Sequence, residues 1–165
     1  MRLKITLDNE KNEEIKIDRE YRKYFISLIK SAFERSGIFS EVYSTKKVKP
    51  FTFSVFLGKG FEFPDEEKIK VTPPFNLIFS TGDPEIISCF YNGVLEMKKD
   101  GKGIKLQGGE ILPIKDISLP TMTKIRSSIC IFKTVGVCVL TDDTKNAKDF
   151  DKWYCVPQDD NREVF

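Results

Sequence analysis

A short run of alternating apolar and polar residues is the strongest structural signal in this chain. Its odd-numbered positions are apolar and its even-numbered positions mostly polar, since Phe51, Phe53, Val55 and Leu57 alternate with Thr52, Ser54 and Phe56. A two-residue period places the two sets on opposite faces of a β-strand. Proline and glycine interrupt strands, so we expect this strand to begin after Pro50 and to end at Gly58. The chain must therefore fold around a sheet that buries one of its faces.

Positive charge is concentrated in the first third of the chain. The whole sequence has a formal net charge of only +2, but the residues from Arg19 to Gly60 include nine basic and three acidic side chains, a net charge of +6. Lys46, Lys47 and Lys49 lie directly before the central strand. Lysines presented by a rigid strand attract phosphates, although a solvated turn is the more ordinary interpretation of such a run. A polyanionic partner would bind this part of the fold.

The composition indicates one ordinary hydrophobic core and excludes a metal or redox centre built on cysteine and histidine. Hydrophobic residues make up 40% and aromatic residues 12% of the 165 residues, which suffices for one domain. The four cysteines are far apart and the chain has no histidine, so we expect no zinc site, no redox pair and no cofactor. The first residues lack the apolar run of a signal peptide, and no segment approaches membrane-spanning length. We therefore expect a soluble, cytoplasmic protein with no membrane partner.

Two stretches have the period of amphipathic helices. The first, expected near residues 19–35, follows Asp18 as its cap and stops at Gly37. The second, expected near residues 83–98, has Asp83 as its cap and Pro84 at its first helical position. The apolar stripes are Tyr21, Tyr24, Phe25, Leu28, Ile29, Ala32 and Phe33 in the first helix and Ile87, Phe90, Tyr91, Val94 and Leu95 in the second. We expect both stripes to belong to the core.

Strands around these helices complete a βαββαβ order. We expect strands at residues 2–7, 51–57 and 75–80, a loop at 64–74, and a last strand region at 103–107 and 110–119 that two glycines break. This order predicts an α+β, ferredoxin-like (RRM-like) domain at residues 1–120, with an antiparallel sheet and both helices on one face. Residues 121–165 are expected to form a β-hairpin, from Ile125–Leu140 and Trp153–Val156, which is the length of the start of a second such domain.

Four segments, in order along the chain, together carry a resemblance to one protein family. They are Met1–Ile5, Tyr24–Ile29 in the first helix, Lys49–Ser54 in the central strand and Phe79–Glu85 before the second helix. Together they resemble the CRISPR-associated endoribonucleases of the RAMP superfamily, which cut the repeat RNA of CRISPR precursor transcripts. Phe132–Val137 resembles the strand that opens the second ferredoxin-like domain of that family. Since the glycine-rich loop of that second domain is absent from this chain, the resemblance implies an amino-terminal domain followed by the start of the next.

The resemblance implies a cleavage that needs no metal. The ribose 2′-hydroxyl attacks the adjacent phosphate, leaving a 2′,3′-cyclic phosphate and a 5′-hydroxyl. Many members use a tyrosine, a histidine and a lysine, and these positions fall on Lys30, near Tyr43 to Thr45, and on Lys49. Some members replace the histidine with several lysines, whose charge stabilises the pentacoordinate transition state. The candidate catalytic residues are therefore Lys30, Tyr43 and Lys49, and the candidate RNA-binding residues are Arg22, Lys23, Lys46 and Lys47.

Two functions of different class stay open from the sequence. The first is a CRISPR repeat-RNA endoribonuclease, present here as an incomplete chain. The second is a non-catalytic RNA-binding or scaffold module of a CRISPR ribonucleoprotein, which the missing histidine and the missing loop favour. CRISPR repeat RNA is the expected partner in both, and the second adds other CRISPR-associated proteins. An unpaired edge on the carboxy-terminal hairpin also predicts a homodimer.

Overall fold

The computed structural model describes residues 1–9, 13–43, 49–64, 66–107 and 109–120, and the two short strands β7 (Leu140–Thr141) and β8 (Tyr154–Cys155). The chain divides into two compact units, Met1–Met122 and Thr123–Phe165. In the second unit β7 and β8 pair antiparallel, while the rest of the hairpin expected there lies outside the described residues. Within the described part of the chain, no helix is long and apolar enough to cross a membrane.

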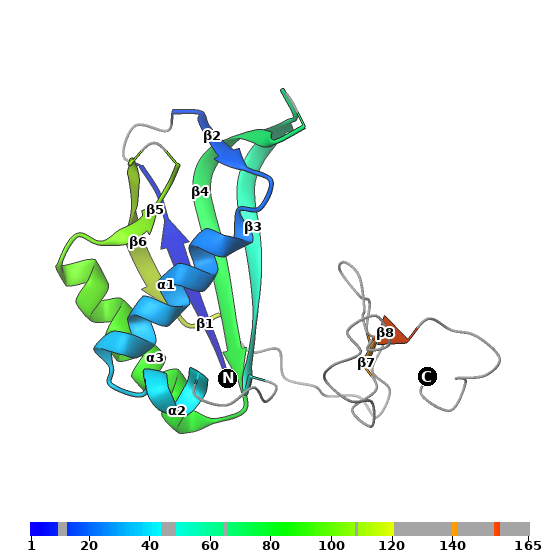
Figure 1. Ribbon diagram of the computed structural model, residues 1–165. Coiled ribbons are helices and arrows are strands. Elements are labelled where there is room, and N and C mark those ends of the chain that lie inside the picture. Colours follow the sequence, from blue (N-terminus) through cyan, green and yellow to red (C-terminus); the bar gives the residue numbers. More distant parts are fainter. Residues whose placement is uncertain are drawn as a thin grey trace, which may run out of the picture. The chain divides into compact units, whose positions relative to one another are not determined.

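The first unit is built on a six-stranded sheet (Figure 1). Its strands are β1 (Arg2–Leu7), β2 (Ile15–Asp18), β3 (Phe51–Glu62), β4 (Lys68–Thr81), β5 (Gly103–Lys105) and β6 (Ile111–Ser118). Four of them lie in the order β6-β1-β4-β3, each antiparallel to its neighbours. β5 pairs with β6 on the far side of that order. β2 and β3 both pair with Lys70, so they lie on opposite edges of β4.

Two long helices cover one face of this sheet (Figure 1). They are α1 (Arg22–Arg35) and α3 (Pro84–Lys99), and the short helix α2 (Phe39–Tyr43) follows α1. A β6-β1-β4-β3 sheet with both helices on one face has the topology of the ferredoxin-like fold. The predicted α+β, ferredoxin-like class is thereby confirmed, with β2 and α2 as additions that the sequence did not predict.

The core lies between the sheet and the two long helices. The predicted stripe of α1 supplies its buried residues, Phe25, Leu28, Ile29, Ala32 and Phe33. The buried residues of α3 are Ile86, Ile87, Phe90, Gly93, Val94 and Met97. Tyr91, which was expected in the stripe of α3, is 41% exposed. Phe79 of β4 stacks on Phe90 of α3 with ring centroids 3.9 Å apart, so aromatic side chains carry the contact between sheet and helix.

The alternation expected for the central strand is confirmed. In β3, the odd-numbered residues from 51 to 57 are buried or half-buried and the even-numbered ones are exposed. The expected end at Gly58 is wrong, because β3 continues to Glu62. A Cβ at Gly58 would lie 1.7 Å from the carbonyl oxygen of Thr72, so β3 and β4 approach too closely there for any side chain. The glycine permits that contact instead of ending the strand.

Asp18 does not cap the first helix, contrary to the prediction. α1 begins at Arg22, and no side chain caps its amino terminus. The Asp18 carboxylate instead accepts a hydrogen bond of 2.7 Å from the Tyr24 hydroxyl and lies 2.7 Å from the ammonium of Lys23 and 2.5 Å from that of Lys68. Two ammonium groups bind a carboxylate more strongly than one neutral backbone N–H does. The side chain therefore joins β2, α1 and β4.

Two other segments differ from expectation. The loop expected at 64–74 is largely strand, because β4 begins at Lys68 and runs through two prolines. The last strand region is a hairpin of β5 and β6. The cap of α3 is as predicted, since the Asp83 carboxylate accepts a hydrogen bond of 2.8 Å from the backbone N–H of Glu85.

Candidate functional site

Three residues from consecutive elements of the chain come together near α1 and α2. Lys30 lies on α1, Tyr43 is the last residue of α2, and Lys49 precedes β3. The Lys30 ammonium lies 5.6 Å and the Lys49 ammonium 4.9 Å from the centre of the Tyr43 ring. Both distances are within the range of cation–π attraction. The structure thus places two positive charges around one phenol.

The ring of Tyr43 is fixed by other aromatic rings. Phe39, one helical turn earlier, stacks on it with centroids 4.9 Å apart. Phe33 of α1 lies 6.3 Å and Phe51 of β3 lies 6.4 Å away. Burial among these rings raises the pKa of the Tyr43 hydroxyl above its ordinary value, because the phenolate would be poorly solvated. At neutral pH Tyr43 is therefore a proton donor.

Lys49 is held from two directions. Its ammonium donates a hydrogen bond of 3.1 Å to the backbone carbonyl of Val42 in α2. The next residue, Pro50, accepts a 2.7 Å hydrogen bond at its carbonyl from the Thr81 hydroxyl. That hydroxyl in turn accepts from the backbone N–H of Asp83, at 3.1 Å. Thr81 is only 7% exposed, so it fixes the start of β3 against the start of α3 and positions Lys49.

The sequence did not identify Thr81 as part of a site. Its segment was expected only to open the second helix, and nothing local indicates a bond to Pro50, which lies 31 residues earlier. The one available signal is a small hydroxyl side chain two residues before the capping aspartate, a spacing at which threonine can accept a bond from the backbone.

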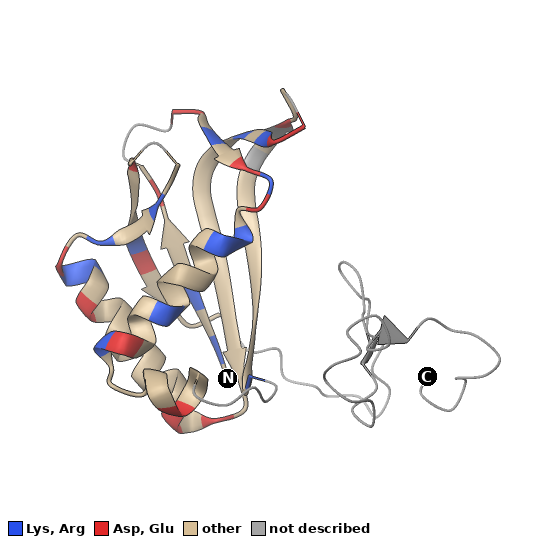
Figure 2. Ribbon diagram, in the orientation of Figure 1, with Lys and Arg blue, Asp and Glu red and all other residues tan. Residues whose placement is uncertain are grey.

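The four predicted RNA-binding residues differ in their surroundings, and the structure describes two of them. Arg22 is exposed on α1, with its guanidinium carbon 5.5 Å from the ring centre of Phe53. Lys23 lies 2.7 Å from the Asp18 carboxylate, which balances its charge. Lys46 and Lys47 lie outside the described residues. Figure 2 shows that basic residues recur along α1, which is the helix that carries Arg22 and Lys30.

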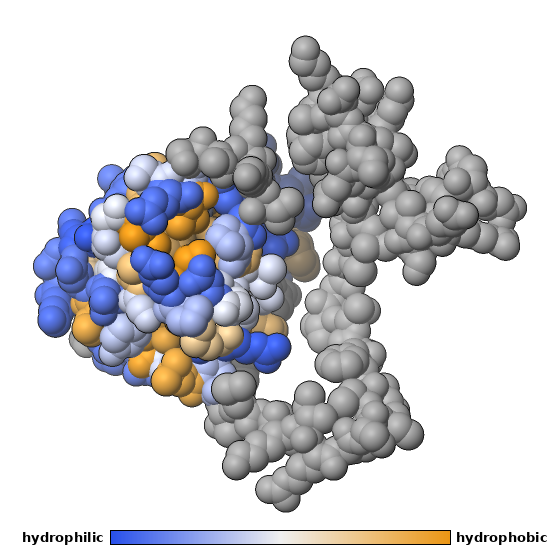
Figure 3. All heavy atoms as spheres, turned by 90° about the horizontal axis from the view of Figure 1, so that it is seen from below, coloured by the Kyte–Doolittle hydropathy of each residue, from blue (hydrophilic) through white to orange (hydrophobic). Residues whose placement is uncertain are grey.

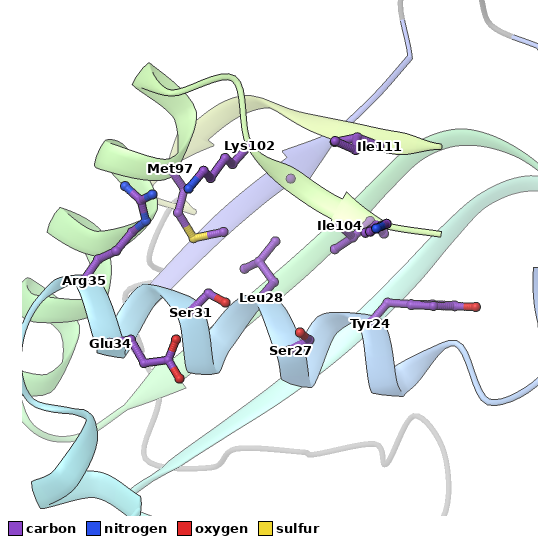
Figure 4. A pocket seen from close by; sticks show the side chains of 12 residues that line it. Tyr24, Ser27, Leu28, Ser31, Glu34, Arg35, Met97, Lys102, Ile104 and Ile111 are labelled. Carbon is purple, nitrogen blue, oxygen red and sulfur yellow. The ribbon is translucent and has the colours of Figure 1, made fainter. Parts of the chain in front are cut away.

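A separate groove of about 570 Å³ lies between α1, the end of α3 and β5 (Figure 4). Its floor is apolar and its rim carries the hydroxyls of Ser27 and Ser31, together with Glu34 and Lys102. None of the residues predicted from the sequence to act on RNA lines it. Over the part of the chain that the structure describes, no three Asp, Glu or Cys side chains gather closely enough to hold a metal ion.

The Lys30, Tyr43 and Lys49 cluster has the parts needed to act on a phosphate ester. Two ammonium groups favour the extra negative charge of a pentacoordinate phosphate, and a neutral phenol can protonate a leaving oxygen. The cluster contains no group that is a good base at neutral pH, since the chain has no histidine. Its geometry therefore suits charge stabilisation and acid catalysis, with the base supplied by solvent.

Comparisons with known proteins agree on one family. A family model described as CRISPR-associated protein Cas6, N-terminal, matches residues 16–106. A solved structure described as a Cas6-related gene product from Pyrococcus furiosus is 23% identical with a TM-score of 0.62, and the match covers 99% of this chain and 67% of that one. A second structure, described as CRISPR associated protein Cas6, is 21% identical with a TM-score of 0.57, covering 96% and 63%. This chain thus spans about two thirds of their length. No curated protein matches it.

Proposed function

Because this chain belongs to the Cas6 family of CRISPR-associated proteins, we propose that it is an endoribonuclease that cleaves CRISPR repeat RNA without a metal ion. The family match supports CRISPR-associated RNA processing in general, and the proposal adds the reaction and its residues. The observation that carries it is the placement of Lys30 and Lys49 at 5.6 and 4.9 Å from the Tyr43 ring, within the most basic third of the chain.

The proposed reaction is an intramolecular displacement at phosphorus. The 2′-hydroxyl loses its proton to hydroxide and its oxygen bonds to the adjacent phosphorus, while the bond from phosphorus to the 5′-oxygen breaks. Lys30 and Lys49 bind the non-bridging oxygens, whose charge rises in the transition state. Tyr43 donates a proton to the leaving 5′-oxygen and regains one from water. The products are a 2′,3′-cyclic phosphate and a 5′-hydroxyl.

Positioning residues around the cluster support this chemistry. Phe39 and Phe33 hold the phenol ring, and Thr81 holds the backbone beside Lys49. A rigid arrangement matters because an in-line displacement needs the phosphate held relative to the attacking oxygen. All of these contacts come from the first unit of the chain.

The test is cleavage of a single-stranded RNA of the repeat sequence in EDTA. We expect one cut with a 2′,3′-cyclic phosphate on the upstream fragment, identified by its mass. The matched control is the same RNA with one 2′-deoxynucleotide at the cut position, which should bind equally and stay intact. Cleavage of the deoxy substrate, or a need for added metal, would overturn the proposed reaction.

A non-catalytic RNA-binding module is the second candidate. Two observations favour it: the chain has no histidine, and the Lys49 ammonium already donates to the Val42 carbonyl. Such a module would bind the repeat RNA as a scaffold, alone, as a homodimer or with other CRISPR-associated proteins. Tight, salt-dependent binding of the unmodified RNA with no cleavage over many hours would select this function.

A further inference from the structure

A second cationic hollow shares Lys49 with the cluster described above. It has a volume of about 370 Å³ and lies at the end of the sheet where β1 begins and β4 ends. Arg2 and Lys49 line it, together with the hydroxyl-bearing residues Thr52, Ser80 and Thr81. The described residues that line this hollow include no acidic side chain. The groove beside α1 is different, because Glu34 lies on its rim.

Strand register places the polar side chains of this hollow in one row. Ser80 of β4 is the partner of Arg2 on one side and of Thr52 on the other. Directly opposed residues in antiparallel strands point to the same face, and neighbouring strands are about 4.8 Å apart. The row therefore spans about 10 Å across the face of the sheet that the helices leave uncovered. Arg2 and Thr52 are exposed and Ser80 is half-buried.

Lys49 connects this row to the cluster on the helix side. Its ammonium lies at the ring of Tyr43, whereas the row of Arg2, Ser80 and Thr52 lies on the other face of the sheet. Arg2 and the two lysines at the Tyr43 ring thus lie at the same end of the sheet. Figure 3, a view from the end at which α2 lies in Figure 1, shows hydrophilic residues close around apolar ones on the described surface.

We propose that Arg2 binds a second phosphodiester of the same RNA, next to the one held by Lys30 and Lys49, and so leads the strand around the end of the sheet; this rests on the proposed function. A guanidinium presents two parallel N–H groups that match two phosphate oxygens. Thr52 and Ser80 add hydroxyls that can bond to a ribose 2′-hydroxyl or to the phosphate. Arg2 and Lys49 are the charged side chains among the described residues that line the hollow, and none of these residues is acidic. This lining suits a polyanion.

The experiment uses the full chain and a fluorescent single-stranded RNA of the repeat sequence that carries a 2′-deoxynucleotide at the cut position. Anisotropy gives the affinity of wild type, Arg2→Ala, Arg2→Lys and the matched control Lys4→Ala as a function of salt. Lys4 lies two residues further along β1 and, like Arg2, opposite β4 on the same face, but it does not line the hollow. Urea unfolding of each variant checks that the substitutions do not alter folding.

We expect Arg2→Ala to weaken binding about tenfold at low salt and to reduce the salt slope by about 0.7, as for one lost phosphate contact. Arg2→Lys should keep the slope and lose part of the affinity, and Lys4→Ala should have little effect. A second set of RNAs, each with one neutral methylphosphonate, locates the contact. At one position, the methylphosphonate should not weaken binding to Arg2→Ala any further, because the contact is already lost. This position should lie next to the one at which the methylphosphonate does not weaken binding to Lys49→Ala.

Three results would overturn the inference, and they distinguish its failure from a failure of the proposed function. Equal losses in Arg2→Ala and Lys4→Ala, with a clear loss in Lys49→Ala, would leave the site at Lys30 and Lys49 intact and remove Arg2 from it. A wild-type chain that does not bind the RNA at any salt concentration would overturn both. If the positions at which the methylphosphonate has no further effect on Arg2→Ala and on Lys49→Ala are not adjacent, Arg2 contacts a different part of the RNA. That result also contradicts the proposal.

Discussion

Replacing Asp18 with asparagine tests whether the buried carboxylate holds the first unit together. The Asp18 side chain is 12% exposed and lies between Lys68, 28% exposed, and Lys23, 51% exposed. The asparagine amide would keep an oxygen that accepts the Tyr24 hydroxyl, so the packing stays the same and only the charge is lost. The perturbation is therefore electrostatic.

The expected loss follows from the exposure of each partner. A hydrogen bond to a charged group contributes about 1.5–3 kcal/mol when both partners are shielded from water, and solvent reduces this for Lys68. The contact with the more exposed Lys23 adds little. We expect Asp18→Asn to lower the free energy of unfolding by about 2 kcal/mol. The matched control is Asp100→Asn. Asp100 lies at the same 2.7 Å from its partner Arg35, but its side chain is 49% exposed. We expect this substitution to lower the free energy of unfolding by less than about 1 kcal/mol.

Urea unfolding followed by circular dichroism, from about pH 7 to about pH 2, measures both losses. Hydrogen bonds from Lys23, Lys68 and Tyr24 hold the pKa of Asp18 well below its ordinary value of 3.8. A carboxyl pKa that is lower in the folded than in the unfolded state stabilises the fold fully at pH values above the unfolded pKa. This stabilisation disappears as the pH falls through the folded pKa. The difference in the free energy of unfolding between wild type and Asp18→Asn should therefore be constant from about pH 7 to about pH 5 and shrink below about pH 4. A loss equal to that of Asp100→Asn, or one that does not change with pH, would refute this reasoning.

Three further predictions concern packing and the candidate site. Gly93→Ala should destabilise the chain by about 1–3 kcal/mol, because the new Cβ would lie 2.0 Å from the Ala32 carbonyl oxygen, whereas Gly82→Ala, with open space around it, should change stability little in the same urea titration. Tyr43→Phe should bind RNA as wild type does but cleave it at least about 100-fold more slowly in a single-turnover assay, since only the proton donor is lost. The wild-type cleavage rate should rise steadily from about pH 6 to about 9, because hydroxide is the base and burial keeps the raised pKa of Tyr43 above that range; a maximum near neutral pH would contradict this.

Features with a local periodic signal could be predicted from the sequence. The two-residue period of β3 and the helical stripe of α1 depend on neighbours within a few residues, and tertiary packing left both intact. The cap at Asp83 is equally local, because it bonds to Glu85. These elements sufficed for the ferredoxin-like topology, since the order of strands and helices allows few arrangements.

Features that depend on distant residues could not be predicted. Asp18 has the sequence context of a cap, but its strongest partners include Lys68, which lies 50 residues away. β2 has only four residues, too few to show a period. The end of β3 was misplaced because the reason for Gly58 is a backbone contact with Thr72 on another strand.

The candidate site also combines residues that the sequence indicates with residues that only the folded structure brings together. Lys30 was selected only by resemblance to a family, whereas Lys49 was also indicated by the basic run before the central strand. Tyr43 is recognisable as part of the cluster only through its contacts with both lysines. Arg2 and Thr81 were not selected at all. Their relation to Lys49 depends on the pairing of β1 and β3 with β4, which brings residues 2, 49 and 81 together.

The central claim is that Lys30 and Lys49 act on one phosphate beside Tyr43. The most direct measurement is the single-turnover cleavage rate of repeat RNA in EDTA for wild type, Lys30→Ala, Lys49→Ala and the double variant. Residues that act as a unit are not additive, so each single variant should lose most of the rate and the double variant little more. Single variants that cleave at the wild-type rate, or a double variant whose loss is the full product of the two single losses, would contradict the claim.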